Sequence, residues 1–394
     1  MGRRAAAWAR GWGRRALFAG TVAVAWSATA AAQSREYRAF VVSESVDEVA
    51  LITFGPSGAR VERKATVGLS IIDPDGPHGV AVSPDKRHYF ISTAHGLPGG
   101  SLWKYDASRD EPIGRAVLGN FPATVQVSPD GWYAWVVNFN LHGEMVASSV
   151  SVVETGEMLE VARITTCTMP HGSRLNPAGT KHYSACMMDE ELVEIDTRRF
   201  EVARHFFLTA GKEMGMDGAP PVRGAEANAA PAAHAGHDMG GHGMEPPKPG
   251  DVGCSPTWAQ PSADGTRVWV ACNKSSELVE IDVAKWSLVR RIPAGDGVYN
   301  LGITRDGTRL VATNKRGQSV SVFDTRSGKE LARIATTRRV VHGVAITDDD
   351  RYAFVSNEGV GSEKSTVDII DLISLKVVAT VEVGQQAGGI EIWR

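Results

Sequence analysis

The chain has 394 residues, with 42 Lys and Arg against 45 Asp and Glu and a formal net charge of −3. A slightly acidic chain without basic runs is a poor match for nucleic acid, so we expect no nucleic-acid partner. Beyond the leader described next, no apolar run is long enough to cross a bilayer, and we expect no membrane span in the mature chain.

The first 32 residues have the composition of an export signal. Arginines precede an apolar run that begins at Ala16 and ends on three alanines before Gln33. This pattern predicts a signal peptide over residues 1–32 and a periplasmic or secreted protein. The pair Arg14-Arg15 also resembles a twin-arginine signal, and the sequence leaves that route and ordinary secretion open.

From residue 33 to residue 394 the chain repeats one unit roughly every 45 residues. Each unit has short alternating segments, a tight turn of the Ser-Pro-Asp-Gly type, and a third segment that ends on an acidic residue. The turns begin at Ser83, Ser128, Asn176, Ser262, Arg305 and Thr347, and the acidic residues are Asp106, Glu154, Asp196, Asp282, Asp324 and Asp371.

Four-stranded units at this period are blades of a β-propeller, because each blade must bury its sheet against the next. We predict an all-β, seven-bladed β-propeller of four-stranded antiparallel blades, forming a single domain over residues 33–394. Six complete blades begin near His78, Ala123, His171, Pro256, Tyr299 and His342. The seventh is split between residues 37–67 and 389–393, so that N- and C-terminal strands share one blade and close the ring.

Three segments carry a family resemblance: Ser128-Pro129-Asp130-Gly131, Val136–Asn138 and Val355–Glu358. They resemble the YVTN repeat family of exported bacterial propellers, over nearly all of the mature chain outside residues 211–253. The resemblance implies the fold and leaves the activity open, because propellers of this kind include surface proteins, lactonase-like enzymes, haem-d1 nitrite reductase and the copper enzyme nitrous oxide reductase.

The first strand of each propeller blade lines the central channel, where binding sites gather. Three blades carry histidine at one register of this strand, namely His78, His171 and His342. We expect these imidazoles to converge on the channel mouth, where they either contact a cofactor or substrate or have a structural role. At the same register the remaining blades are expected to place Ala123, Thr257, Asn300 and Ala387, with His95 and His142 approaching from nearby connections.

Residues 211–253 interrupt the repeat with a segment rich in Gly, Ala and Pro, which predicts a flexible insertion. Imidazole and thioether ligands together favour copper, and the segment resembles the His/Met-rich stretches of periplasmic copper-handling proteins. As a connection between blades, the insertion is expected on the same face as the three histidines; the alternative is a disordered tether with incidental affinity. The candidate metal ligands are His234, His237, Met239, His242 and Met244.

Four cysteines in an exported chain favour disulfides, and the absence of a CxxC spacing argues against a zinc ribbon. Each pair brackets the first hairpin of a blade, which predicts Cys167 bonded to Cys186 and Cys254 bonded to Cys272. Soft-metal ligation by these cysteines, with methionines near the first pair, is the alternative.

Signatures of common enzyme classes are absent from the sequence, including GxSxG, HExxH, the Walker loop and GxGxxG. The sequence therefore favours an exported binding or scaffold protein over an enzyme, with copper as the candidate metal. Two alternatives stay open: a metal-dependent or lactonase-like enzyme with its site at the channel, and a module that binds another exported protein.

Overall fold

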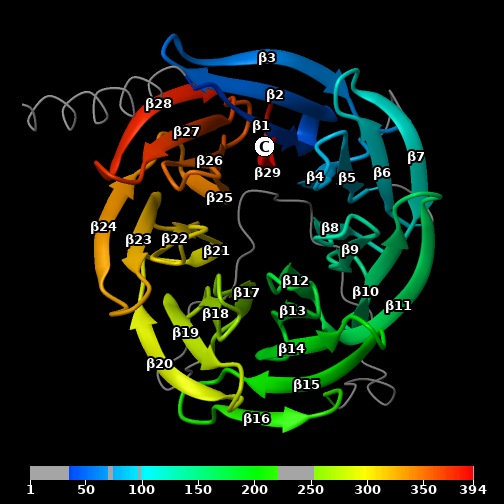
Figure 1. Ribbon diagram of the computed structural model, residues 1–394, viewed down its shortest axis with the longest axis vertical. Helices are drawn as coiled ribbons and strands as arrows, with labels where there is room; N and C mark the ends of the chain where they lie inside the picture. The colour runs from blue at the N-terminus through cyan, green and yellow to red at the C-terminus, as the bar shows by residue number, and fades with distance from the viewer. Residues whose placement is uncertain (1–34, 70–73, 96–98, 221–252, 394) are drawn as a thin grey trace, which may run out of the picture.

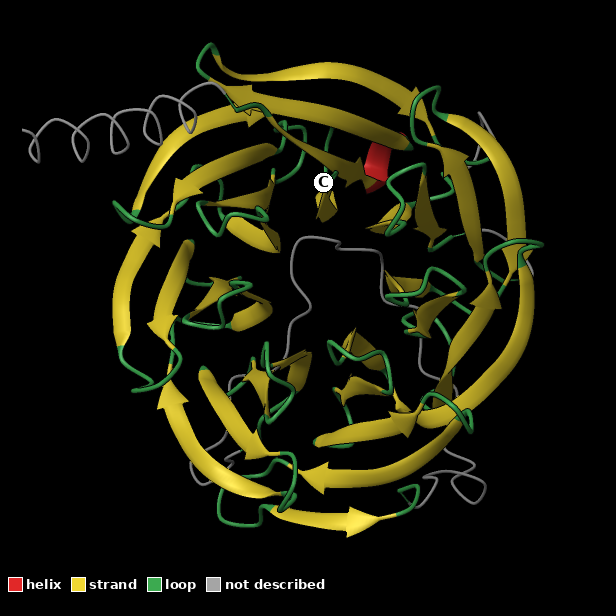
Figure 2. Ribbon diagram, in the orientation of Figure 1, coloured by secondary structure: helices red, strands yellow, loops and turns green. Residues whose placement is uncertain are grey.

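The computed structural model describes residues 35–69, 74–95, 99–220 and 253–393. Within these residues the strands form seven antiparallel sheets, arranged as a ring around a central channel (Figures 1 and 2). This confirms the predicted seven-bladed β-propeller. We number the complete blades 1 to 6 in chain order, call the sheet that holds both chain ends the closing blade, and name strands A to D from the channel outward.

The bounds of the strands follow the predicted repeat closely. The closing blade contains β29 (Ala387–Ile392), β1 (Tyr37–Ser43), β2 (Glu48–Gly55) and β3 (Gly58–Thr66), with a 3-10 turn, η1 (Glu44–Val46), between β1 and β2. Blade 1 contains β4 (Pro77–Val82), β5 (His88–Thr93), β6 (Ser101–Asp106) and β7 (Glu111–Val117). Blade 2 contains β8 (Pro122–Val127), β9 (Tyr133–Asn138), β10 (Ala147–Glu154) and β11 (Leu159–Thr168).

The other half of the ring is built in the same way, with one addition. Blade 3 contains β12 (Pro170–Leu175), β13 (Lys181–Cys186), β14 (Glu191–Asp196), β15 (Glu201–Phe207) and a fifth strand, β16 (Met214–Asp217). Blade 4 contains β17 (Pro256–Pro261), β18 (Arg267–Cys272), β19 (Glu277–Asp282) and β20 (Ser287–Pro293). Blade 5 contains β21 (Val298–Ile303), β22 (Arg309–Asn314), β23 (Ser319–Asp324) and β24 (Glu330–Ala335). Blade 6 contains β25 (Val340–Ile346), β26 (Tyr352–Glu358), β27 (Thr366–Asp371) and β28 (Lys376–Glu382).

The turn signals of the sequence act through side-chain hydrogen bonds. In blade 1 the Ser83 hydroxyl donates to Asp85 (2.6 Å), whose carboxylate also accepts the amide of Arg87. The acidic residue that ends strand C has a matching role, since Asp196 accepts the amides of Arg198 and Arg199. These recurring acids are therefore turn-forming groups.

The two chain ends meet in the closing blade, as predicted. Strand β29 pairs antiparallel with β1, with Ile392 opposite Ala39 and Ile390 opposite Val41. Just past β29, the Trp393 indole donates to the Lys86 carbonyl of blade 1 (2.9 Å) and lies under two arginine side chains. The ring is thus closed by a strand from the far end of the sequence.

The hydrophobic core lies between blades as well as within them. Ala39, Val41 and Ile52 of the closing blade pack against Phe354 and Ile369 of blade 6 in one buried cluster. Other clusters join other neighbouring blades, as when Trp258 and Trp269 of blade 4 pack against Phe323 of blade 5. Each blade therefore depends on its neighbours for burial.

Glycine near the start of strand A lets neighbouring blades approach each other at the channel. A Cβ added to Gly79 would lie 2.2 Å from the Ala123 carbonyl oxygen, and one added to Gly172 would lie 2.3 Å from that of Thr257. Any side chain at these positions would push adjacent blades apart.

The insertion was expected to be flexible from residue 211 to residue 253, and this is wrong for its first part. Residues 214–217 form β16, which pairs with the outer edge of β15 and leaves the blade near Gly218. Strand β16 is the outermost strand of blade 3, so the described chain leaves this blade at its outer rim. It is described again from Gly253, next to the start of β17. The predicted ligands His234, His237, Met239, His242 and Met244 lie outside the described residues.

Candidate binding site at the channel mouth

A bulge at the start of strand A places each predicted histidine. Pro77 pairs with Thr93, but the next paired residue is Gly79, so His78 lies in the irregular step between them. His171 and His342 lie in the corresponding irregular steps of β12 and β25. A bulge turns a side chain away from the regular pleat, here toward the mouth.

The structure corrects two of the residues expected at this register. Val298 pairs with Asn314 just as Pro122 pairs with Asn138, so the residue of blade 5 at the histidine register is Tyr299 and not Asn300. In the closing blade Ala387 pairs with Ser43, which makes Gly388 the equivalent residue and not Ala387. The expectation failed because both strands lack the Pro-His-Gly or Val-His-Gly sequence that marks this register in blades 1, 3 and 6.

Tyr299 joins two of the histidines from opposite sides of the channel. Its hydroxyl lies 2.9 Å from His171 Nε2 and 3.3 Å from His342 Nε2. His171 Nδ1 lies 2.9 Å from the Thr257 carbonyl oxygen, which can only accept, so this nitrogen donates. In neutral His171, Nε2 then accepts a hydrogen bond from the Tyr299 hydroxyl. The Tyr299 oxygen in turn accepts a hydrogen bond from His342 Nε2.

Burial favours the neutral forms of His342 and Tyr299. His342 is 5% exposed and His171 is 2% exposed. Burial, followed by the positive charge of Lys315, holds the pKa of His342 well below its ordinary value. Burial likewise raises the pKa of the Tyr299 phenol, against the opposing effect of Lys315. The arrangement can hold or pass a proton between two imidazoles through one phenol.

The third histidine belongs to a second cluster built around Glu44. One oxygen of this carboxylate lies 3.0 Å from His78 Nδ1 and the other lies 3.1 Å from His95 Nε2. Burial opposes ionisation of Glu44, but the hydrogen bonds from the two histidines outweigh it and lower its pKa to about 2. The same hydrogen bond raises the pKa of His95. His142 stacks beside His95, with ring centroids 5.7 Å apart.

The two clusters meet, and the three histidines lie together at the channel. The ring of His78 lies 5.5 Å from that of His342. A partly buried ion pair completes this polar layer, because Lys315 Nζ lies 3.4 Å from Glu358 and 4.4 Å from the centre of the Tyr299 ring. Burial opposes the charge of Lys315, but Glu358, Tyr299 and Glu44 together outweigh burial and raise the pKa of the amine.

Sequence reasoning missed Glu44, Lys315, Glu358 and Tyr299. The first three share a position at the end of strand B, where Ser43, Asn314 and Asn357 are the last residues paired with strand C. Each comes directly after one of these: Glu44 after Ser43, Lys315 after Asn314, and Glu358 after Asn357. An alignment of the blades on the end of strand B would have brought them together.

A cavity lies in the channel next to this layer. It is lined by His78, His171, His342, Arg174, Trp258 and Asn300, among others, and has about 430 Å³ of space when the open water at its mouth is included. Two of the lining residues each have a buried polar atom without a hydrogen-bond partner: Asn300 Oδ1 and Trp258 Nε1. Buried polar groups in proteins are rarely left unpaired unless they have a use.

The described residues offer no ready metal centre. Among them no group of three or more His, Cys, Asp or Glu side chains is placed to hold a metal ion. At the mouth, Tyr299 occupies the position between His171 and His342 that a shared metal would need.

Both predicted disulfides are present, and the four cysteines are all paired. The Cα atoms of Cys167 and Cys186 are 5.8 Å apart. Cys167 belongs to β11 of blade 2 and not to the blade 3 hairpin, so this bond joins neighbouring blades. The second bond, between Cys254 and Cys272, fixes the returning end of the insertion to strand B of blade 4.

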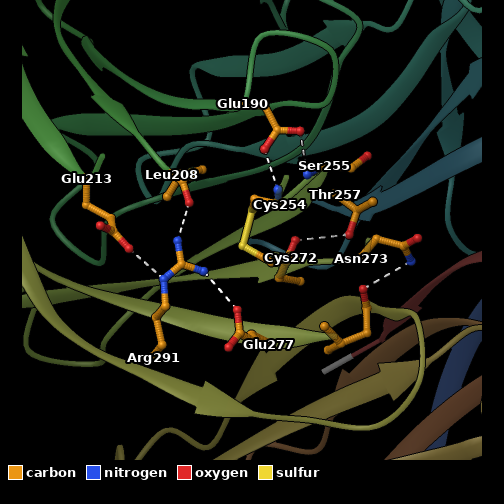
Figure 3. The surroundings of a disulfide bond; sticks show 12 residues. Glu190, Leu208, Glu213, Cys254, Ser255, Thr257, Cys272, Asn273, Glu277 and Arg291 are labelled. Carbon is orange, nitrogen blue, oxygen red and sulfur yellow. Dashed lines mark hydrogen bonds and ion pairs between the residues drawn. A yellow bond between two sulfur atoms is a disulfide. The ribbon is translucent and has the colours of Figure 1, made fainter. Parts of the chain in front are cut away.

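Polar contacts hold both described ends of the insertion around the second disulfide (Figure 3). The Glu190 carboxylate accepts the amides of Cys254 and Ser255. On the outward path, Arg291 binds Glu213 (2.6 Å), Glu277 (2.9 Å) and the Leu208 carbonyl. The returning end therefore lies firmly beside the B-to-C connection of blade 3, on the face of the channel mouth.

Within the described residues, no helix has the length and apolar character needed to cross a membrane. Disulfides form and persist in oxidising compartments, and the two bonds here are consistent with export.

Comparison with known proteins supports the fold and nothing finer. No family model and no curated protein matches the chain. Among solved structures it is similar to the hydrazine synthase of Kuenenia stuttgartiensis, with 20% identity, a TM-score of 0.60 and coverage of 82% of this chain and 92% of that chain. It is also similar to a functionally unknown protein from Desulfotomaculum acetoxidans, with 13% identity, a TM-score of 0.62 and coverage of 90% and 98%. These similarities show the seven-bladed propeller architecture.

Proposed function

We propose that this chain is an exported propeller that binds a small polar molecule in its channel. Its repeats resemble those of the YVTN family. The observation that carries the proposal is the cavity beside the histidines, whose walls contain the unpartnered Asn300 Oδ1 and Trp258 Nε1. An unpaired buried polar group costs about 1–3 kcal/mol, which a bound ligand would recover. The Tyr299 bridge and the Glu44 cluster supply a rigid rim above it.

A thermal-shift screen of the mature protein tests this function. The panel contains small carboxylates, amides, sugars and amines at constant ionic strength, and each positive compound is measured again by calorimetry. We expect at least one class to raise the melting temperature of the wild type, and the rise to be lost in Asn300→Ala. The matched control is Asn120→Ala, at an exposed asparagine outside the cavity. No shift with any class, or equal shifts in both variants, would refute binding in the channel.

Copper binding by the insertion is a second candidate. The observation in its favour is that the chain returns from the insertion on the mouth face, where Glu190 and the Cys254–Cys272 bond hold it. His and Met together supply ligands suited to copper. The three channel histidines are not part of this candidate site, because the described residues do not fit a shared metal there.

Elemental analysis of natively exported protein tests the copper proposal. The full mature chain is compared with a variant that lacks residues 233–244. Copper that is present in the first and absent from the second supports binding by the insertion. Equal copper in both places the metal elsewhere, and no copper in either removes this candidate.

A further inference from the structure

Arg174 is a partly buried arginine of the channel that forms no ion pair with a carboxylate of the described residues. It lies on β12, lines the cavity, and stacks on Trp258 with its guanidinium carbon 4.6 Å from the ring centre. Its Nη1 donates to the neighbouring Ser173 carbonyl oxygen (3.0 Å). Among the described residues no carboxylate forms an ion pair with the guanidinium; burial lowers the pKa of Arg174, and the more distant Glu391 carboxylate opposes this effect.

A second arginine in the same blade has both an aromatic partner and a carboxylate partner. Arg204 also stacks on a tryptophan, Trp286, at 4.0 Å. Its guanidinium binds both oxygens of the Glu194 carboxylate, at 3.0 and 2.6 Å. This fork-to-fork contact compensates the cost of withdrawing an arginine from water. Arg174 has the aromatic support without the carboxylate.

The other walls of the cavity offer further donors. Trp258, which supports the guanidinium, has a buried indole N–H without a partner. Asn300 is 4% exposed, and its amide can present either its NH₂ group or its oxygen to a bound group. A guanidinium fork and an indole N–H on one cavity form a donor set suited to a planar oxyanion, which Asn300 joins when its NH₂ group, in place of its unpaired oxygen, faces the bound group.

We propose that the channel contains a binding site for a small oxyanion, with Arg174 as the main contact and Trp258 and Asn300 beside it. The chemistry fits the carboxylate group of a small organic acid or an inorganic anion with the same trigonal oxygens. This inference rests on the channel binding proposed above and names the class of ligand. The anion supplies the counter-charge that Glu194 supplies to Arg204.

The test is calorimetry and thermal shift on the full mature chain at constant ionic strength. The probes are acetate and nitrate as trigonal oxyanions, with acetamide as the neutral isostere of acetate and chloride as a simple anion. We expect saturable binding of at least one oxyanion, and no saturable binding of chloride or acetamide. Acetate binding without nitrate binding identifies an organic acid as the source, and the reverse identifies an inorganic anion.

Three variants assign the effect to Arg174. Arg174→Met keeps an extended side chain over Trp258 and should weaken oxyanion binding at least tenfold. Arg174→Lys keeps the charge without the fork and should lie between wild type and Arg174→Met, which provides a second reading if the methionine variant folds poorly. Arg115→Met removes an exposed arginine that stacks on Trp103 and should leave binding unchanged.

The outcomes separate this inference from the proposed function. Oxyanion binding of equal strength in Arg174→Met, or chloride binding as strong as oxyanion binding, overturns the oxyanion site. Binding of neutral compounds that depends on Asn300, without oxyanion binding, overturns the oxyanion site and leaves the channel function standing. An absence of binding by these probes overturns the oxyanion site, and an absence of binding by every class of the earlier panel as well overturns both.

Discussion

The mouth and the interior of the channel hold their buried polar groups in different ways. At the mouth, Glu44 lies between His78 and His95, and Lys315 pairs with Glu358. In the interior, no described carboxylate pairs with Arg174. Behind it, His182 has no hydrogen-bond partner on either ring nitrogen. Paired polar groups stabilise the fold, whereas unpaired buried groups lower its stability. A bound partner that pairs with such groups would recover this cost. One channel thus combines a rim of paired polar groups with an interior that contains unpaired ones.

The largest expected effect comes from the covalent support of the mouth. Cys186 and Cys272 lie opposite the first residues of β12 and β17, so both disulfides anchor the rim. Replacing all four cysteines by serine should lower the free energy of unfolding on the order of 6 kcal/mol, since each bond closes a loop worth about 3 kcal/mol. Urea unfolding at pH 7 measures the loss. A loss below about 1 kcal/mol would show that the disulfides do not support the rim.

The Glu44 cluster should come next. Glu44→Ala leaves His78 and His95 without their shared carboxylate and should cost about 3–5 kcal/mol, as for other buried pairs that lose one partner. Urea unfolding at pH 7 measures this, with Glu157→Ala at an exposed position as the control.

The same cluster has a defined pH window. The pKa of Glu44 falls from 4.5 to about 2 on folding, so its contribution is present above pH 4.5 and is lost as the pH falls toward 2. The pKa of His95 is raised from 6.5, so its contribution is present below pH 6.5 and is lost as the pH rises through the raised value. Stabilisation should therefore be greatest between pH 4.5 and 6.5, and Glu44→Gln should remove this maximum.

In the interior, His182 should act in the opposite direction. It stacks on Trp135 with ring centroids 5.1 Å apart, and burial, followed by Arg174, lowers its pKa from 6.5 to about 3. Its neutral form is required for folding, so stability is lost as the pH falls below 6.5. His182→Phe should gain about 3 kcal/mol at pH 4 and little at pH 8. An acid unfolding curve that matches the wild type would contradict this.

The smallest effect is expected at Tyr299. Tyr299→Phe keeps the ring but removes the hydroxyl that joins His171 to His342, which should cost about 1–2 kcal/mol. Nitrogen NMR of labelled imidazoles should show a changed protonation pattern at His171 Nε2 in the variant. Unchanged imidazole signals would show that the phenol does not set the tautomers.

The repeat made the propeller, the closing blade and both disulfides predictable, because turn residues and strand ends recur at a fixed spacing. The three histidines were predictable for the same reason, through their shared Pro-His-Gly or Val-His-Gly setting. Tyr299 was not, because Val298-Tyr299-Asn300 contains neither the histidine nor the glycine that identifies this register in those three blades. Arg174 could not be identified from the sequence either, because what distinguishes it is that no carboxylate forms an ion pair with it. The spacing of the repeat does not predict which side chains of distant strands form ion pairs.

The register of the closing blade also determines how the ring yields to force. Strands β1 and β29 are antiparallel neighbours, so the first residues of β1 and the last residues of β29 lie at the same end of their ladder. Tension applied to the two chain ends would load the ladder bonds one after another, as in unzipping, and not all together, as in shear. A ring that resists heat through closure would then open at low pulling force, beginning at Ala39 and Ile392 and proceeding toward Ser43.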